Sequence, residues 1–151
     1  MEQKNVQAVF QLQDSFVKGF SINILKKIDD KSNLNISGNL GFKIDDIREN
    51  EDNFIGQVEL INELKISSAE EECGNIHISM VGLFVGTKSN NLDRNKFEEM
   101  LKLNGATTLS HLARAYVYTV TGMSGMPQIS TPMINFVEFF KNAKEVKEKN
   151  K

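Results

Sequence analysis

Apolar and polar residues alternate with a period of two along most of the first ninety positions. Eight apolar residues of the first segment fall on even numbers: Val6, Ala8, Phe10, Leu12, Phe16, Phe20, Ile22 and Ile24. Most of the odd positions between them are polar. Such alternation is typical of a strand with one buried face. It predicts one long strand over residues 6–24, or two strands joined by a bulge near Gly19.

Three further strands are predicted after polar turns. The alternation returns at residues 34–44, 54–66 and 76–84, and polar stretches at 28–33, 48–53 and 69–72 separate these segments. Asn62 is the one residue that breaks the apolar face of the third strand. Short links between consecutive strands favour an antiparallel meander with one buried face.

The period changes to that of a helix after Lys88. A first helix is predicted between Asp93 as N-cap and Gly105 as the residue that ends it. A second, longer helix follows from apolar residues spaced i, i+3, i+4, i+7, i+8 and i+11, namely Leu109, Leu112, Ala113, Tyr116, Val117 and Val120. Four strands followed by helices predict an α+β domain.

A third helix is predicted from residue 135 onward. Asn135 followed by Glu138 resembles a capping box, and Phe136, Phe139 and Phe140 then form one stripe. The charged residues from position 144 onward are expected to fray. We therefore predict a single domain over residues 1–151, with strands at about 5–88 and a helical part at about 93–148.

Composition narrows the range of functions. The chain has 151 residues and a formal net charge of −2, so it offers no global field for nucleic acid or an anionic membrane. Its single cysteine, Cys73, cannot form an internal disulfide and fits a reducing compartment. With no secretory leader in the first residues and no apolar run long enough to span a bilayer, the protein is expected in the cytoplasm.

Catalytic chemistry is not expected. His77 and His111 have no nucleophile at a recognisable motif spacing, and Cys73 adjoins three glutamates, which disfavours a reactive thiolate. Three consecutive glutamates do not converge on one ion as spaced calcium ligands do. The sequence therefore predicts no enzyme, no catalytic residues, no metal site and no cofactor.

The connection after the long helix is unusually apolar. It carries Met123, Met126, Ile129 and Met133, although connections between elements are normally polar. Such a loop either folds back and covers the sheet or presents adaptable methionines to partners. The pattern alone leaves both interpretations open.

Several motifs, in one order over residues 6–140, resemble the bacterial export chaperone family SecB. They are Phe10-Gln-Leu-Gln13, Lys18-Gly-Phe-Ser-Ile22, Gly82-Leu-Phe84, Leu109, Ala113-Arg114, Pro127-Gln-Ile129, and Asn135-Phe136 with Phe140. The resemblance implies a four-stranded antiparallel sheet with helices packed on one side, assembled as a dimer of dimers. It also implies ATP-independent holding of unfolded polypeptides or preproteins in an apolar groove between the second strand and the loop after the long helix.

The resemblance also assigns residues to two surfaces. For client contact it implies Ile36, Leu40, Phe42, Met123, Met126 and Ile129. For the oligomer interface it implies the fourth-strand residues Ile76, Ile78 and Met80. The family docks on the motor SecA through an acidic patch, but the matching positions here are Gly19, Asn23, Asn75 and His77, which argues against SecA docking.

Two alternatives remain beside a general holdase. A dedicated chaperone of one partner, such as an antitoxin, would share the fold and the groove. A small apolar-ligand binding protein would instead have a closed cavity between sheet and helices and no affinity for unfolded chains.

Overall fold

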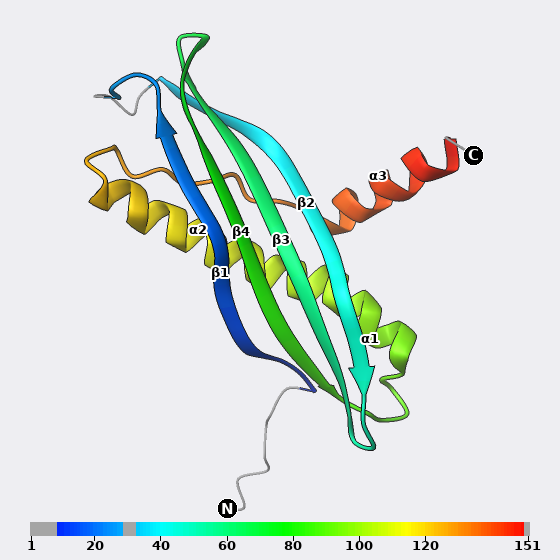
Figure 1. Ribbon diagram of the computed structural model, residues 1–151. Coiled ribbons are helices and arrows are strands. Elements are labelled where there is room, and N and C mark those ends of the chain that lie inside the picture. The colour runs from blue at the N-terminus through cyan, green and yellow to red at the C-terminus, as the bar shows by residue number, and fades with distance from the viewer. Residues whose placement is uncertain (1–8, 29–32, 150–151) are drawn as a thin grey trace, which may run out of the picture.

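The computed structural model describes residues 9–28 and 33–149, so Val6 and Ala8 of the predicted first strand lie outside it. Four long strands form one antiparallel sheet: β1 (Phe10–Ile24), β2 (Leu34–Glu49), β3 (Asn53–Ser68) and β4 (Glu71–Thr87) (Figure 1). The predicted fold class, an α+β domain with a four-stranded antiparallel sheet and helices on one side, is confirmed.

The strand order differs from the expected meander. Only β2, β3 and β4 pair in sequence, and β1 pairs with β4, so the order is β1-β4-β3-β2. The β3–β4 link is a two-residue turn in which Ala69 and Glu70 both have positive φ, as a tight hairpin requires. At the β2–β3 turn, Asn50 Oδ1 accepts hydrogen bonds from the backbone N–H groups of Asp52 and Asn53. The sheet edges are therefore β1 and β2.

Two bulges in β1 change which side chains face the helices. The register shifts between Leu12 and Asp14 and again between Val17 and Gly19, which confirms the bulge expected near Gly19. Between the two shifts, the even-numbered side chains of β1 face the open side of the sheet, whereas before and after them they face the helices. Phe16, predicted on the covered face, is instead paired with Val81 on the open face and is half exposed.

The helical half begins with a nearly continuous helix. It consists of α1 (Arg94–Met100), a π-helical turn at Leu101–Gly105 and α2 (Ala106–Met123). Asp93 is the N-cap, as predicted, because its Oδ1 accepts a 2.8 Å hydrogen bond from the backbone of Lys96. Gly105 does not end the helix: its φ of −64° is helical, and the extra residue of the π turn is accommodated without a break.

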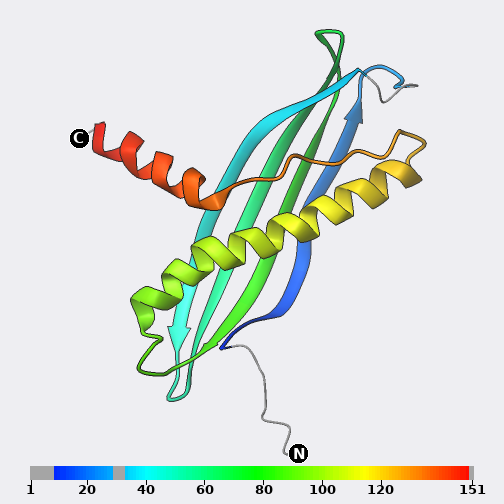
Figure 2. The ribbon, with the colours of Figure 1, turned by 180° about the vertical axis from the view of Figure 1, so that it is seen from behind.

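The third helix is α3 (Phe136–Lys149). Asn135 caps it, because its side chain accepts from the backbone N–H groups of Val137 and Glu138. The charged segment that was expected to fray continues the helix to Lys149. In Figures 1 and 2, α2 crosses one face of the sheet diagonally, and α3 leaves the molecule on the β2 side.

The hydrophobic core lies between the sheet and α2, and glycines on the sheet allow the helix to approach closely. A Cβ atom added at Gly56 would lie 2.6 Å from Leu101 Cδ1, and one at Gly82 would lie 2.8 Å from Leu109 Cδ2. Side chains at these two positions would push the helix away from the sheet.

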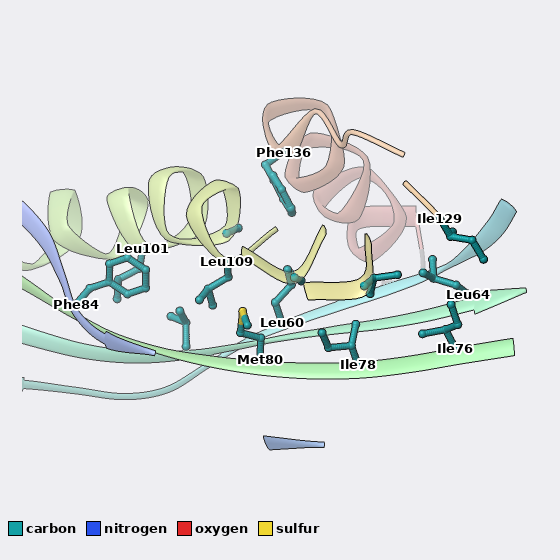
Figure 3. Close-up of a cluster of buried hydrophobic side chains, with 14 of the residues drawn as sticks. Leu60, Leu64, Ile76, Ile78, Met80, Phe84, Leu101, Leu109, Ile129 and Phe136 are labelled. Atoms are coloured by element: carbon teal, nitrogen blue, oxygen red, sulfur yellow. The ribbon is translucent and has the colours of Figure 1, made fainter. Parts of the chain in front are cut away.

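The core includes the three residues that were expected at an oligomer interface. Ile76, Ile78 and Met80 are at most 6% exposed, and their side chains point from β4 into the core on the α2 side (Figure 3). The interface prediction is wrong for them in this structure, because the helical half of the same chain already covers the face to which their alternation assigns them.

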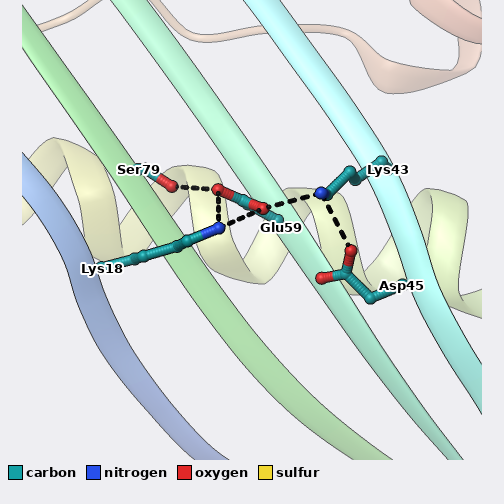
Figure 4. Close-up of polar contacts among 5 residues, drawn as sticks. All are labelled: Lys18, Lys43, Asp45, Glu59 and Ser79. Atoms are coloured by element: carbon teal, nitrogen blue, oxygen red, sulfur yellow. Dashed lines mark hydrogen bonds and ion pairs between the residues drawn. The ribbon is translucent and has the colours of Figure 1, made fainter.

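The open face of the sheet carries an ionic row that joins all four strands. The Glu59 side chain on β3 is only 4% exposed, accepts a hydrogen bond from Ser79 Oγ on β4, and lies 3.2 Å from Lys18 Nζ on β1 and 3.4 Å from Lys43 Nζ on β2 (Figure 4). The Ser79 hydroxyl is the largest cause that lowers the pKa of Glu59, and the two lysines add to it, while burial opposes them.

We expect stability to lose the contribution of Glu59 at low pH. Because the pKa of Glu59 in the folded protein is below its ordinary value of 4.5, the contribution is complete above that pH and is lost as pH falls through the lowered value. Urea unfolding of the wild type and Glu59→Gln at pH 7 and at pH 3 measures it. The difference in unfolding free energy should shrink at pH 3, and a constant difference would contradict the assignment, since the other carboxylates titrate in both proteins.

Candidate functional site

A shallow hollow lies between β2 and the connection that follows α2. Its lining comes from β2, β3 and the end of the connection: Ser37, Gly38, Asn39, Leu40, Asn62, Leu64, Thr131, Pro132 and Ile134. Gly38 contributes no side chain to the helix side of β2 between Ile36 and Leu40. A Cβ atom there would lie 2.1 Å from the backbone oxygen of Glu63, so the close approach of β2 to β3 requires glycine.

The connection, residues 124–135, folds back across the sheet. It starts where α2 ends on the β1 side and reaches α3 on the β2 side (Figures 1 and 2). Ile129 holds it down: its side chain is 1% exposed, close to Leu64 and Ile76 (Figure 3), and its backbone N–H donates to Thr121 Oγ1 at 2.9 Å. The connection therefore covers part of the core, as the first of the two sequence interpretations proposed.

The burial of Ile129 corrects one client-contact prediction. A side chain with 1% exposure has no surface to offer a client, because it fills the space between the connection and the sheet. Ile129 is an anchor of the connection in this structure. The apolar residues that flank it along the chain differ from it in exposure.

Two exposed methionines, one at the end of α2 and one in the connection, fit the second interpretation. Met123 is 82% exposed at the end of α2, and Met133 is 71% exposed near the start of α3, while Met126 is half-buried. The connection thus covers the core at its middle and exposes apolar side chains at both ends. The sequence pattern could not separate the two roles because all of these residues are apolar.

The three predicted residues of β2 all lie on the helix side of the sheet and are half-buried. Leu40 lines the hollow, whereas the ring of Phe42 meets Phe140 of α3 edge-on, with 5.3 Å between centroids. The structure therefore brings Leu40 together with the connection and places Phe42 beneath α3. Met123 lies at the opposite end of the connection from this hollow, at the β1 side.

A second crevice runs along the other side of the connection, next to α2. It is lined by Thr107, Ser110, His111, Arg114, Met133, Ile134 and Phe136. Ile134 lies in the lining of both hollows, so the end of the connection forms an apolar ridge between them. Sequence reasoning missed Thr131, Pro132 and Ile134 as wall residues, because nothing in their spacing indicates that they reach β2.

The chemistry that these surfaces can perform is binding. Within residues 9–28 and 33–149, no group of three or more His, Cys, Asp or Glu side chains could hold a metal ion. In the same part of the chain, no helix has the length and apolar character needed to cross a bilayer. The lining groups of the hollow offer apolar contact from Leu40, Leu64 and Ile134 together with a few hydrogen-bonding groups.

The four positions matched to an acidic docking patch lie together on the open face. Asn23 is paired with Asn75, and Gly19 and His77 face the same side of the sheet. His77 Nδ1 lies 3.5 Å from Glu63 Oε1. None of the four positions carries a carboxylate, which leaves the expectation against SecA docking in place.

Comparison with known proteins identifies similar chains. The family model described as preprotein translocase subunit SecB matches residues 3–147. A solved SecB-like chaperone from Mycobacterium tuberculosis, in complex with a ChAD peptide from the HigA1 antitoxin, is 15% identical with a TM-score of 0.60, over 83% of this chain and 91% of that one. A protein of unknown function from Streptococcus agalactiae is 9% identical with a TM-score of 0.39, over 82% and 96%. No curated protein matches the chain.

Proposed function

This chain belongs to the SecB family, and we propose that it is an ATP-independent chaperone that holds unfolded polypeptides or preproteins against the hollow beside β2. The observation that carries the proposal is the hollow itself, which has apolar walls on β2, β3 and the connection and exposed apolar side chains nearby. The cytoplasmic location expected from the sequence belongs to the same proposal, because preproteins are held before they cross a membrane.

Many shallow contacts suit this function energetically. At roughly 25 cal/mol per Å² of apolar surface, a client segment that buries several hundred Å² gains several kcal/mol without a tight fit of side chains. Ordering of the client offsets a good part of this gain. The hollow is therefore expected to bind many apolar segments with modest affinity.

A dedicated role is the second candidate. The SecB-like chaperone from Mycobacterium tuberculosis was solved with an antitoxin peptide, which supports a single-partner function for a chain of this fold. The positions matched to the SecA patch carry no carboxylate here, which favours a role without that motor. Both candidates use the same hollow.

The binding of a permanently unfolded protein tests the proposal. Fluorescein-labelled, reduced and carboxymethylated α-lactalbumin is titrated with the purified protein without ATP and followed by anisotropy. We expect saturable binding, and no binding of native α-lactalbumin. A protein that ignores the unfolded chain is not a general holdase. Capture from the host lysate then separates many preproteins from one dominant partner.

Assembly into a homo-oligomer, with the dimer of dimers as the expected form, is part of the proposal. The edge of β1 that faces away from β4 pairs with no other strand in the described part of the chain. Large exposed apolar side chains lie in β1 and directly beside it: Val9, Phe16, Ile24 and Leu25. An exposed apolar edge strand is a surface suited to pairing with another copy. We infer that β1 takes the interface role first assigned to Ile76, Ile78 and Met80.

A charge on β1 should weaken that assembly. In sedimentation velocity we expect the wild type to exceed the 17.0 kDa of one chain and Phe16→Glu to raise the dissociation constant at least about tenfold, since a charge is desolvated at the contact. Asn35→Glu, on the open face of the opposite edge strand, is the matched control and should sediment as the wild type does. Equal behaviour of the two variants would reject β1 as the interface.

A further inference from the structure

Two buried polar side chains beside β2 have no hydrogen-bond partner among the described residues. The buried polar side chains of the described residues are Glu59, Asn62, Ser79, Thr121 and Thr131. Glu59, Ser79 and Thr121 are hydrogen-bonded through their side chains. Asn62 and Thr131 are each 6% exposed, and neither side chain bonds to another described residue. Both line the hollow between β2 and the connection.

The polar atoms of these two side chains are accessible through the hollow. Every fully buried side-chain nitrogen or oxygen in the described residues has a hydrogen-bond partner. Because the polar atoms of Asn62 and Thr131 have none, these atoms must be partly exposed at the surface. The surface to which both contribute is the wall of the hollow. The two groups come from different elements, β3 and the connection, and line the same hollow.

The Asn62 and Thr131 side chains lower the stability of the protein unless a bound molecule hydrogen-bonds to them. A polar group with so little exposure and no partner in the protein is less stable than a hydrogen-bonded one, because little water can reach it. Asn62 lies opposite Leu40 and Ile78 on the helix side of the sheet, among apolar residues where leucine would pack well. An occupant of the hollow that offered hydrogen bonds would recover this cost.

The peptide group is the occupant that these atoms match. The Asn amide has an acceptor and a donor, which is the complement of the N–H and C=O of one peptide unit, and the Thr hydroxyl can do either. The outer edge of β2 also pairs with no strand among the described residues, so an extended chain can lie beside it. A peptide group is present in every unfolded chain whatever its side chains.

We propose that Asn62 and Thr131 form a polar subsite that hydrogen-bonds one peptide unit of an extended client segment, while Leu40 and Ile134 contact its flanking apolar side chains. This inference rests on the proposed chaperone function and adds how the hollow recognises a client. The subsite recognises the backbone of the client rather than its side chains. It fixes the register of an extended segment in a hollow whose apolar contacts alone would let it slide.

The test measures affinity and stability together. Asn62→Leu and Thr131→Val remove the polar groups at nearly constant volume. We expect each to weaken binding of labelled, carboxymethylated α-lactalbumin about tenfold, because the client's peptide group then loses its partner. We also expect the melting temperature of Asn62→Leu to rise, because a buried polar group without a partner is gone. Asn35→Leu, on the opposite face of β2, should leave affinity unchanged.

The outcomes separate the subsite from the chaperone function. Wild-type affinity in both folded variants would overturn the subsite and leave the function intact. A wild-type protein that fails to bind the unfolded chain would overturn both. Asn62 lies in a central strand, so Asn62→Leu could fail to fold. Thr131 lies in the connection, and Thr131→Val alone then tests the subsite.

Discussion

We expect Leu40→Asp to lower the affinity for carboxymethylated α-lactalbumin at least about 100-fold. Leu40 is a half-buried wall of the hollow, directly across from Asn62 in the β2–β3 register. An aspartate there must lose its hydration when an apolar client segment covers it, and an unpaired charge is very costly to bury. Anisotropy titration measures the loss, and circular dichroism checks the fold.

The control for this prediction is the next residue along the strand. Gly41 faces the open side of the sheet, and a Cβ atom added there meets nothing closer than 3.7 Å. Gly41→Asp introduces the same charge one position away and should bind as the wild type does. Leu40→Ser serves if the aspartate variant unfolds, with a smaller loss expected. Tight binding by a folded Leu40→Asp protein would mean that clients bind elsewhere.

The second large effect is expected at Gly82, on the helix side of β4. Gly82→Val should lower the free energy of unfolding by about 3 kcal/mol, at the upper end of the usual cost of overpacking. Its Cβ atom alone would lie 2.8 Å from both Leu109 Cδ2 and Phe84 Cε2, and the two γ-methyl groups would extend further into α2. Urea unfolding monitored by circular dichroism gives the value.

Two further variants show whether helix contact is the cause. Gly41→Val makes the same substitution on the open face and should be neutral or slightly stabilising, because valine favours strands. Leu109→Ala alone should cost about 2–5 kcal/mol. Combined with Gly82→Val it should cost clearly less than the sum, since the valine fills the space that Leu109 leaves. Strict additivity would contradict the packing assigned to Gly82.

The sequence predicted the strands well because their signal is local. Alternation reports the side on which each side chain is buried, and it placed Leu60, Ile66 and Phe84 correctly in the core. It failed at Phe16, where two bulges reverse the parity between them. The bulge near Gly19 was expected, but the one between Leu12 and Asp14 was not, because a bulge depends on how the neighbouring strand pairs. The same reason explains the strand order, since no periodicity says that β1 joins β4.

Burial and the identity of the covering surface are separate questions. The pattern correctly marked Ile76 and Ile78 as residues that must be covered, and the family resemblance assigned that cover to a second copy. In the structure the helical half of the same chain covers them, with Ile129 of the connection close to Ile76. An apolar side chain is stabilised by removal from water, but its hydrophobicity does not specify which surface it packs against.

The binding site shows the same division. By itself the sequence determined the apolar faces, the helix caps at Asp93 and Asn135, and the break in the third strand at Asn62, because each depends on residues close along the chain. Only the tertiary structure decided that Ile129 anchors the connection and that Thr131 meets Asn62 across the hollow. Asn62 and Thr131 are 69 positions apart in the sequence, and only the packing of the whole chain brings them to one hollow.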